Sequence, residues 1–254
     1  MTRSNAVSSL LSSVLLGGVL LAVPSVAHAQ SATTTSTTTS TTTTTAGGTD
    51  HSQVVGTFGV GYMGLGGIAI SNGGTGAQNI DAPIIGVRYW LNDGMGIDAG
   101  IGFGYSSGST TVKSGSTTVD TDRPAATGFL LHGGVPLALA SGQHHTFQIV
   151  PELNLGYGSQ TVKAPAGSNG DDTKNSGFRL DIGARAGTEV QFGFIGLPNL
   201  ALQATVGVYF SYQSITTKTG DNNETSASAT SLSTSVQSAP WAIFTNNISA
   251  LYYF

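Results

Sequence analysis

The stretch GFRLDIGARAGTEVQF, residues 177–192, is the part of the sequence that decides the fold. Its alternate residues separate into an apolar or small set and a charged, amide or glycine set. The first set is Phe178, Leu180, Ile182, Ala184, Ala186, Thr188, Val190 and Phe192. The second set is Arg179, Asp181, Gly183, Arg185, Gly187, Glu189 and Gln191. Because successive side chains on a β-strand point to opposite faces, this pattern predicts a strand with one apolar face.

The same period of two recurs along the chain and predicts eight strands. They are expected at about 53–66, 82–91, 95–106, 125–139, 146–159, 177–193, 200–215 and 240–254. Most reach the ~9–11 residues that a tilted strand needs to cross a bilayer. Short turns alternate with longer polar loops, which are expected near 71–81, 107–123, 161–176 and 216–238. This alternation is typical of outer-membrane barrels, so we predict an all-β fold, an eight-stranded antiparallel up-and-down transmembrane β-barrel over residues 51–254.

Charged residues of both signs lie in the middle of the predicted strands, all on the polar face. They are Arg88, Asp98, Glu152, Arg179, Asp181, Arg185 and Glu189. Eight strands enclose a lumen just wide enough for side chains to fill it, and the glycines of this face would leave room for them. We therefore expect a polar network in the lumen. It is either structural packing, since unpaired buried ions are costly, or a gate or polar relay.

The N-terminus has the pattern of a secretory signal peptide. Arg3 gives the positive start, residues 10–23 are apolar but too short for a comfortable membrane helix, and Ala27 and Ala29 form an A-x-A cleavage pattern. We predict a signal peptide at 1–29 and a Thr/Ser-rich disordered linker at 30–50.

Composition argues against several classes of function. The net charge is −4 and only 9% of residues are charged, so a basic face for nucleic acid is not expected. The sequence contains no Cys, which excludes disulfides and thiolate metal sites.

The spacing G-x-G-x-x-G occurs at Gly59, Gly61 and Gly64. A dinucleotide site needs a strand before this motif and a helix after it. Turn residues without a helical period follow it here, so we interpret these glycines as part of a barrel strand. No cofactor is predicted.

The histidines offer two weaker candidates for chemistry. His144 and His145 either bind a metal or lie in a solvated turn. His132 is either a catalytic base or a satisfied interior residue on the lumen face. No carboxylate lies next to His144 and His145 in the sequence, so we predict no metal site. With no His-x-Ser pair on a strand, we predict no catalytic residue and no enzyme.

The chain closes with NNISALYYF, in which Ile248, Ala250, Tyr252 and Phe254 share one face. This ending resembles the C-terminal strand signal of Gram-negative outer-membrane barrels. With the strand count and turn asymmetry, residues 53–254 resemble the small eight-stranded family of the OmpA transmembrane domain and the OmpX-like porin-family proteins. The resemblance implies recognition by the barrel-assembly machinery, localisation in the cell outer membrane and no cofactor.

Aromatic residues, Trp90 and Tyr253 among them, fall mainly near strand ends and are expected in girdles at the two membrane interfaces. The expected partners are outer-membrane lipids, lipopolysaccharide and an unknown extracellular partner that contacts the loops. We therefore predict a structural or surface-interaction role. Two alternatives are a small outer-membrane enzyme acting on lipid A and a soluble secreted lipocalin-like barrel that binds an apolar ligand.

Overall fold

The structure is a computed structural model that describes residues 48–71, 77–164, 170–221, 223–236 and 247–254. The predicted signal peptide at 1–29 lies outside the described residues, as does the predicted linker up to residue 47. Residues 46–254 form one compact unit.

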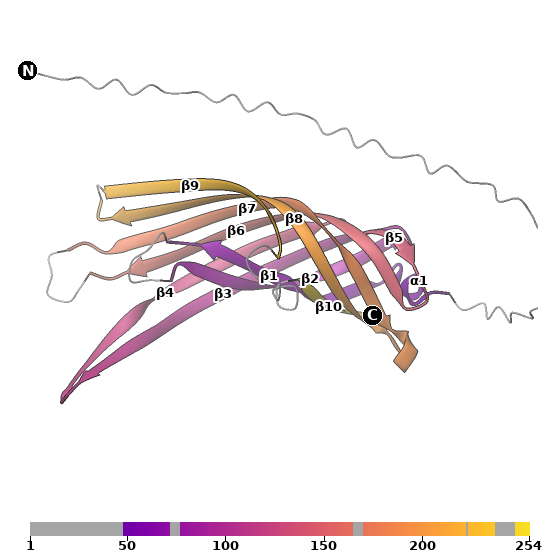
Figure 1. The fold of residues 1–254 in the computed structure, drawn as a ribbon, viewed down its shortest axis with the longest axis horizontal. Helices are drawn as coiled ribbons and strands as arrows, with labels where there is room; N and C mark the ends of the chain where they lie inside the picture. The colour runs from indigo at the N-terminus through magenta and orange to yellow at the C-terminus, as the bar shows by residue number, and fades with distance from the viewer. Residues whose placement is uncertain (1–47, 72–76, 165–169, 222, 237–246) are drawn as a thin grey trace, which may run out of the picture. The chain divides into compact units, whose positions relative to one another are not determined.

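The unit is built almost entirely of β-strands (Figure 1). These are β1 Phe58–Ala69, β2 Asn79–Asn92, β3 Met95–Ser114, β4 Thr117–Gly134, β5 Leu137–Ser141, β6 His145–Val162, β7 Thr173–Phe192, β8 Leu197–Thr219, β9 Asn223–Thr234 and β10 Ile248–Tyr253. A short 3₁₀ turn, η1 Gly193–Ile195, joins β7 to β8.

Eight of these strands form a closed ring. Each pairs antiparallel with its neighbour in the order β1, β2, β3, β4, β6, β7, β8 and β10, and β10 also pairs with β1. Since neighbours in the ring follow one another along the chain, the barrel is up-and-down. The predicted eight-stranded antiparallel barrel is thus confirmed. β5 pairs with β3 and β6 beside the end of β4, and β9 pairs with β8.

Alternation sets the two faces of the wall. Along β2, Ile85 and Val87 are exposed on the outside, whereas Arg88 and Trp90 are fully buried inside. The other ring strands repeat this arrangement, so the apolar face is outward and the polar face lines the lumen. The charged side chains of residues 177–192 therefore point into the lumen, on the one face to which the sequence pattern assigned them.

A one-turn helix, α1 Asp50–Val54, precedes β1 and lies at the end of the barrel that carries β5 (Figure 1). Thr49 caps it, because its side chain accepts a hydrogen bond from the Ser52 N–H at 3.1 Å. The predicted strand at 53–66 therefore begins later, at Phe58, and Asp50 is buried rather than part of a linker. No helix within the described ranges is long and apolar enough to cross a membrane.

Two strand pairs extend further than the sequence predicted. β3 and β4 continue as a hairpin through 107–123, and this hairpin projects well beyond the rest of the barrel (Figure 1). The loop predicted at 216–238 is wrong in part, because it contains β9, which pairs with the far half of β8. Ser and Thr dominate β9, and these hydroxyl residues led us to expect a loop.

The last predicted strand is interrupted. Ser235 donates its N–H to Gly207 O, and Thr205 donates its N–H to Asn247 O. Hydrogen bonding to the edge of β8 therefore stops at Gly207 after β9 and resumes at Thr205 before β10. Of the strand predicted at 240–254, the described part is β10; residues 240–246 lie outside the described residues.

β1 turns into the lumen in its second half. The pairing with β2 shifts register between Tyr62 and Gly64, and Gly64 has φ 141°, a conformation that favours glycine. Beyond this bulge, the side chains of Ile68 and Ile70 are completely buried and form a cluster with Ile80 and Ala126.

Glycines of the opposite wall make room for this inward turn. A Cβ on Gly156 would meet the Ile68 side chain, and a Cβ on Gly158 would meet that of Ile70. A Cβ on Gly177 would collide with the main chain of Ala69. We call the cluster of Ile68, Ile70, Ile80 and Ala126 the apolar plug.

Candidate functional site

The predicted polar residues all come from the ring strands and point inward. Arg88 lies on β2, Asp98 on β3, Glu152 on β6, and Arg179, Asp181, Arg185 and Glu189 on β7. Six of them are buried, and Arg179 is half-buried. The structure divides them into one connected set of five and a separate pair.

Arg88 is the centre of the connected set. It pairs in register with Asp98 on the neighbouring strand, where Nε donates to Oδ1 at 2.7 Å and Nη2 to Oδ2 at 2.6 Å. Its Nη1 donates to Oε2 of Glu189 at 2.5 Å. The planar guanidinium thus binds one carboxylate with two hydrogen bonds and a second with its remaining edge, as its fixed geometry favours.

Glu189 is fully buried and fully surrounded by donors. Besides Arg88, its carboxylate accepts hydrogen bonds from Gln148 Nε2 at 3.2 Å, Gln191 Nε2 at 3.3 Å and Tyr253 OH at 3.0 Å. These donors come from three strands, so they fix the carboxylate against the wall of the lumen.

Two aromatic residues of this region were predicted wrongly. Trp90 and Tyr253 do not belong to an interface girdle, because both are buried inside the barrel. Trp90 Nε1 donates to Tyr253 OH at 3.2 Å, and the Arg88 guanidinium lies 5.7 Å from the centre of the indole ring. Alternation explains the error, since each is adjacent to an outward residue, Tyr89 or Tyr252, and must face the other way.

Arg185 extends the set towards the other end of the barrel. Its Nη2 donates to Asp98 Oδ2 at 3.3 Å, and its Nε lies 3.1 Å from Glu152 Oε2 as an ion pair without hydrogen-bond alignment. The order of contacts is Glu189, Arg88, Asp98, Arg185, Glu152. We call these five residues the ionic chain.

Arg179 and Asp181 form the separate pair. Arg179 Nε donates to both carboxylate oxygens of Asp181, at 2.8 and 2.9 Å, and Nη1 donates to the Gly67 carbonyl at 2.7 Å. Arg179 therefore ties the inward turn of β1 to the opposite wall.

A cavity of about 350 Å³ lies between the ionic chain and the Arg179–Asp181 pair. Glu152 and Arg185 face it, together with Tyr209 from β8 and His132 from β4. Tyr209 OH donates to Glu152 Oε1 at 2.8 Å. A Cβ on Gly183 or Gly207 would meet the Tyr209 ring, so these glycines make space for it.

His132 is held on one side only. Its Nδ1 lies 2.7 Å from Asn154 Oδ1, and the Asn154 amide in turn lies within 3.5 Å of Glu152 Oε1. Because an amide oxygen only accepts, Nδ1 is the donor in this contact, and Nε2 is an acceptor in that tautomer. Nε2 is buried and has no hydrogen-bond partner among the described residues.

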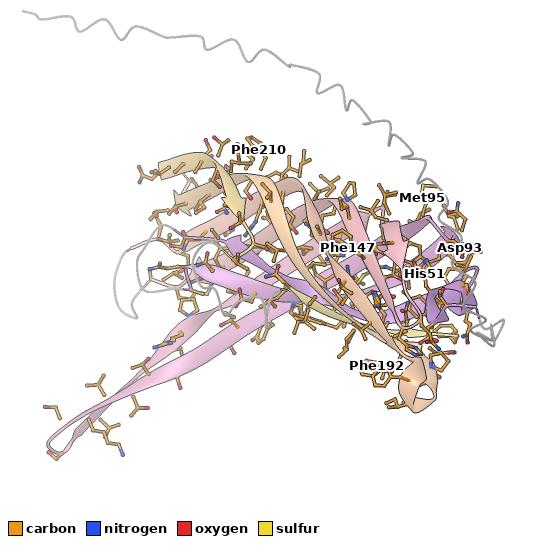
Figure 2. The ribbon with its side chains drawn as sticks, turned by 45° about the vertical axis from the view of Figure 1, so that its right-hand side comes forward. His51, Asp93, Met95, Phe147, Phe192 and Phe210 are labelled. Carbon is orange, nitrogen blue, oxygen red and sulfur yellow. The ribbon has the colours of Figure 1, made fainter. Side chains whose placement is uncertain are left out.

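The second histidine candidate lies at the α1 end. His144 Nδ1 is 2.7 Å from Asp50 Oδ2, which also accepts the Gly193 N–H at 3.0 Å. His51 Nε2 lies 2.9 Å from the Asp93 carbonyl (Figure 2). His144 lies in the predicted turn with its side chain 31% exposed, and α1 brings a carboxylate to it that the sequence did not predict. The described residues contain no group of three or more metal-ligating side chains.

Alternation could have identified more of this site. Gln148 and Asn154 share the polar face of β6 with Glu152, and Tyr209 shares a face with Thr205 and Ser211 on β8. The sequence does not indicate which side chains from opposite strands contact one another across the lumen.

The C-terminal residues lie on the outer face of β10. Tyr252 and Phe254 are exposed, and Ile248 and Ala250 are half-buried. The alternate residues Ser249, Leu251 and Tyr253 are buried inside.

Comparisons with known proteins give structural likeness only. No family model and no curated protein matches the chain. Among solved structures, it is similar to Ail, the attachment invasion locus protein of Yersinia pestis, with 13% identity and a TM-score of 0.35 over 78% of this chain and 97% of Ail. It is also similar to a major outer membrane protein from Thermus thermophilus, with 14% identity and a TM-score of 0.38 over 78% of this chain and 98% of that one.

Proposed function

We propose that this chain is an integral outer-membrane β-barrel with a structural role and a surface-interaction role. The observation that carries the proposal is a belt of exposed apolar side chains around the outer wall. It includes Ile85, Ile101, Leu131, Leu153, Ile182 and Val206, which come from six different strands. A soluble monomer rarely exposes contiguous apolar surface beyond a few hundred Å², whereas a membrane barrel needs such a surface against lipid.

The lumen supports the same proposal. A lipocalin-like barrel would leave an apolar interior open for its ligand, but here Arg88, Asp98 and Glu189 occupy one half of the lumen. The barrel's own apolar plug occupies the other half. Antiparallel pairing around the closed ring also gives the strands internal partners for backbone hydrogen bonds, as the hydrocarbon region of a bilayer requires. We therefore favour the membrane barrel over the soluble alternative.

In the proposed orientation, α1 and the short turns face the periplasm and the long hairpins face outside, as in other outer-membrane barrels. The proposed signal peptide would deliver the chain across the inner membrane. We propose a place in the small eight-stranded group that includes the OmpA transmembrane domain and OmpX. The outward face of β10, ending in Phe254, would be the segment read by the barrel-assembly machinery.

The surface-interaction role is assigned to the projecting parts of two strand pairs, β3 with β4 and β8 with β9. The hairpin tip of β3 is exposed on both faces, and so is nearly all of β9. Their hydroxyl-rich side chains offer hydrogen bonds to lipopolysaccharide sugars or to an extracellular partner. Nucleic acid is not a proposed partner.

We propose no enzymatic role. Expression in a Gram-negative host should leave the mass spectrum of lipid A unchanged, and replacing His132 by Ala should change nothing in that spectrum. A new lipid A species that depends on His132 would instead establish the enzyme alternative.

The membrane proposal can be tested with two substitutions on one strand. Ile101 and Val112 are both exposed on β3, but Ile101 lies in the belt and Val112 on the projecting hairpin. Arginine near the bilayer midplane costs ~2–4 kcal/mol and much less near or beyond the interface. We expect Ile101→Arg to lower the free energy of unfolding in lipid vesicles by that amount and Val112→Arg to leave it nearly unchanged.

Equal effects of the two substitutions would contradict the proposal. So would a protein that stays monomeric without detergent and does not shift in gel mobility on heating.

A further inference from the structure

The ionic chain leaves one negative charge uncompensated, and the contacts locate it. Its members are three carboxylates and two guanidiniums, while Arg179 and Asp181 neutralise each other separately. At one end, Glu189 is stabilised by four donors. At the other end, Glu152 shares Arg185 with Asp98, so the excess charge lies at Glu152.

Glu152 and His132 both line the cavity, and each carries an acceptor atom without an aligned hydrogen bond. Oε2 of Glu152 accepts no aligned hydrogen bond from the described residues, its one contact being the ion pair with Arg185 Nε at 3.1 Å, and Nε2 of His132 has no hydrogen-bond partner there. Both side chains are at least nine-tenths buried, at 9% and 7% exposure. A buried acceptor without a donor costs free energy comparable to a lost hydrogen bond, and more when the acceptor is charged.

A ligand for this cavity must therefore supply donors and positive charge. A primary ammonium group has three N–H donors and no acceptor, which matches one carboxylate oxygen, one imidazole nitrogen and a neighbouring hydroxyl. Thr205 and Ser211 provide such hydroxyls in the wall of the cavity. Its volume of about 350 Å³ falls in the range of small-molecule sites.

We propose that this cavity binds the primary ammonium group of a small organic amine, with Glu152 and His132 as its acceptors. The wall of the cavity includes residues 233–235 at the end of β9 and Asn247 at the start of β10, where the ladder along β8 is interrupted. The amine can be a free molecule or the headgroup of a lipid, since both carry the same ammonium chemistry.

The test uses the full barrel purified in detergent and ethanolammonium chloride as the probe. Binding is measured by calorimetry and by the ¹⁵N shift of His132 Nε2. Ethylene glycol has the same skeleton with a hydroxyl in place of the ammonium, and tetramethylammonium carries the charge without N–H donors. We expect ethanolammonium to bind and to shift the Nε2 resonance, with both other compounds and K⁺ at least about tenfold weaker.

Glu152→Gln removes the charge with little change of shape and should weaken ethanolammonium binding about tenfold or more. Glu224→Gln is the matched control, because Glu224 is exposed on β9 and pairs with Lys218. Equal affinity of wild type for ethanolammonium and ethylene glycol would overturn the proposal without any variant. So would tighter binding of K⁺, or a Glu152→Gln barrel with unchanged affinity.

The source of the amine is separated by repeating the titration in nanodiscs. Competition in phosphatidylethanolamine discs but not in phosphatidylcholine discs would identify a lipid headgroup as the occupant. Equal binding in both would identify a free amine.

Discussion

The two halves of the lumen differ in the side chains that fill them: charged and polar groups dominate one half, and apolar groups fill the other. Towards α1, the ionic chain and its amide and phenol donors lie beside buried apolar residues such as Val54 and Leu251, and Arg88 is completely buried. Towards the long hairpins, the apolar plug of Ile68, Ile70, Ile80 and Ala126 occupies it, packed against glycines of the far wall. The lumen of the same eight-stranded ring is therefore blocked mainly by ion pairs in one half and by close apolar packing in the other.

This difference predicts different responses to damage. A buried ion depends on its specific partner, because removing one leaves a charge in a low dielectric. An apolar contact depends on volume, so it tolerates a change of chemistry better than a change of size. Substitutions in the two halves can therefore distinguish stabilisation by ion pairing from stabilisation by apolar packing.

The largest effect is expected at Arg88. Arg88→Met removes the shared partner of Asp98 and Glu189 and leaves both carboxylates without their strongest contact. Breaking a buried pair in this way costs about 3–5 kcal/mol. Urea unfolding in lipid vesicles should show a loss of this size. Arg179→Met is the comparison and should cost less, since the Arg179 side chain is 29% exposed.

In the apolar half, the critical change is one of size. A Cβ on Gly177 would collide with the Ala69 carbonyl, whereas a Cβ on Gly133 would have nothing within 4 Å. Gly177→Ala should therefore lower the free energy of unfolding by about 1–3 kcal/mol, as overpacking does. Gly133→Ala, measured in the same way, should be close to neutral. A neutral Gly177→Ala would show that the inward turn of β1 is not tightly packed.

A smaller and more local effect is expected at α1. Asp50→Ala removes the acceptor of the Gly193 N–H and the partner of His144. We expect about 1 kcal/mol of local destabilisation, seen as roughly fivefold faster amide exchange at α1 and Gly193, with global unfolding unchanged. Asp93→Ala is the control, because His51 contacts only the main-chain carbonyl of Asp93.

The smallest effect is expected at the exposed loop between β6 and β7. Hydrogen bonds from Lys163 Nζ and the Ala164 N–H lower the pKa of Asp172 below its ordinary value. A depressed carboxyl pKa stabilises the folded loop above the unfolded value, about 3.9, and this contribution is lost as pH falls through the lower folded value.

Carboxyl ¹³C NMR should show Asp172 titrating below that reference, and Lys163→Met should raise its pKa. Lys218→Met removes a lysine from a different surface pair and should leave the Asp172 titration unchanged. An unchanged titration in Lys163→Met would contradict the assignment.

The sequence predicted the ring of strands because alternation is a local property. Residues 177–192 show the inward charges and outward apolar side chains without any knowledge of neighbours, and the structure has β7 there. Alternation also predicts that Trp90 and Tyr253 face inward, whereas their positions near strand ends favour girdles, and in the structure both are buried inside.

The features that the sequence did not predict depend on contacts across the lumen. α1 is a single turn whose Asp50 meets His144 and Gly193 from distant parts of the chain. The inward turn of β1 needs the glycines of β6 and β7 on the opposite wall. Neither leaves a periodic signal, because each is specified by a partner far away in sequence.

The short β10 has a consequence for the order of assembly. Within the described part of the chain, its six residues complete the ring, pairing Gly59 with Tyr253 on one side and Ala204 with Ile248 on the other. The other seven ring strands pair with neighbours that follow one another along the chain, so they can add to the sheet one after another. The seam between β1 and β10 joins the most distant segments of the fold and carries the largest loop-closure entropy. Closing this seam is therefore the step that converts an open sheet with two unsatisfied edges into a finished barrel.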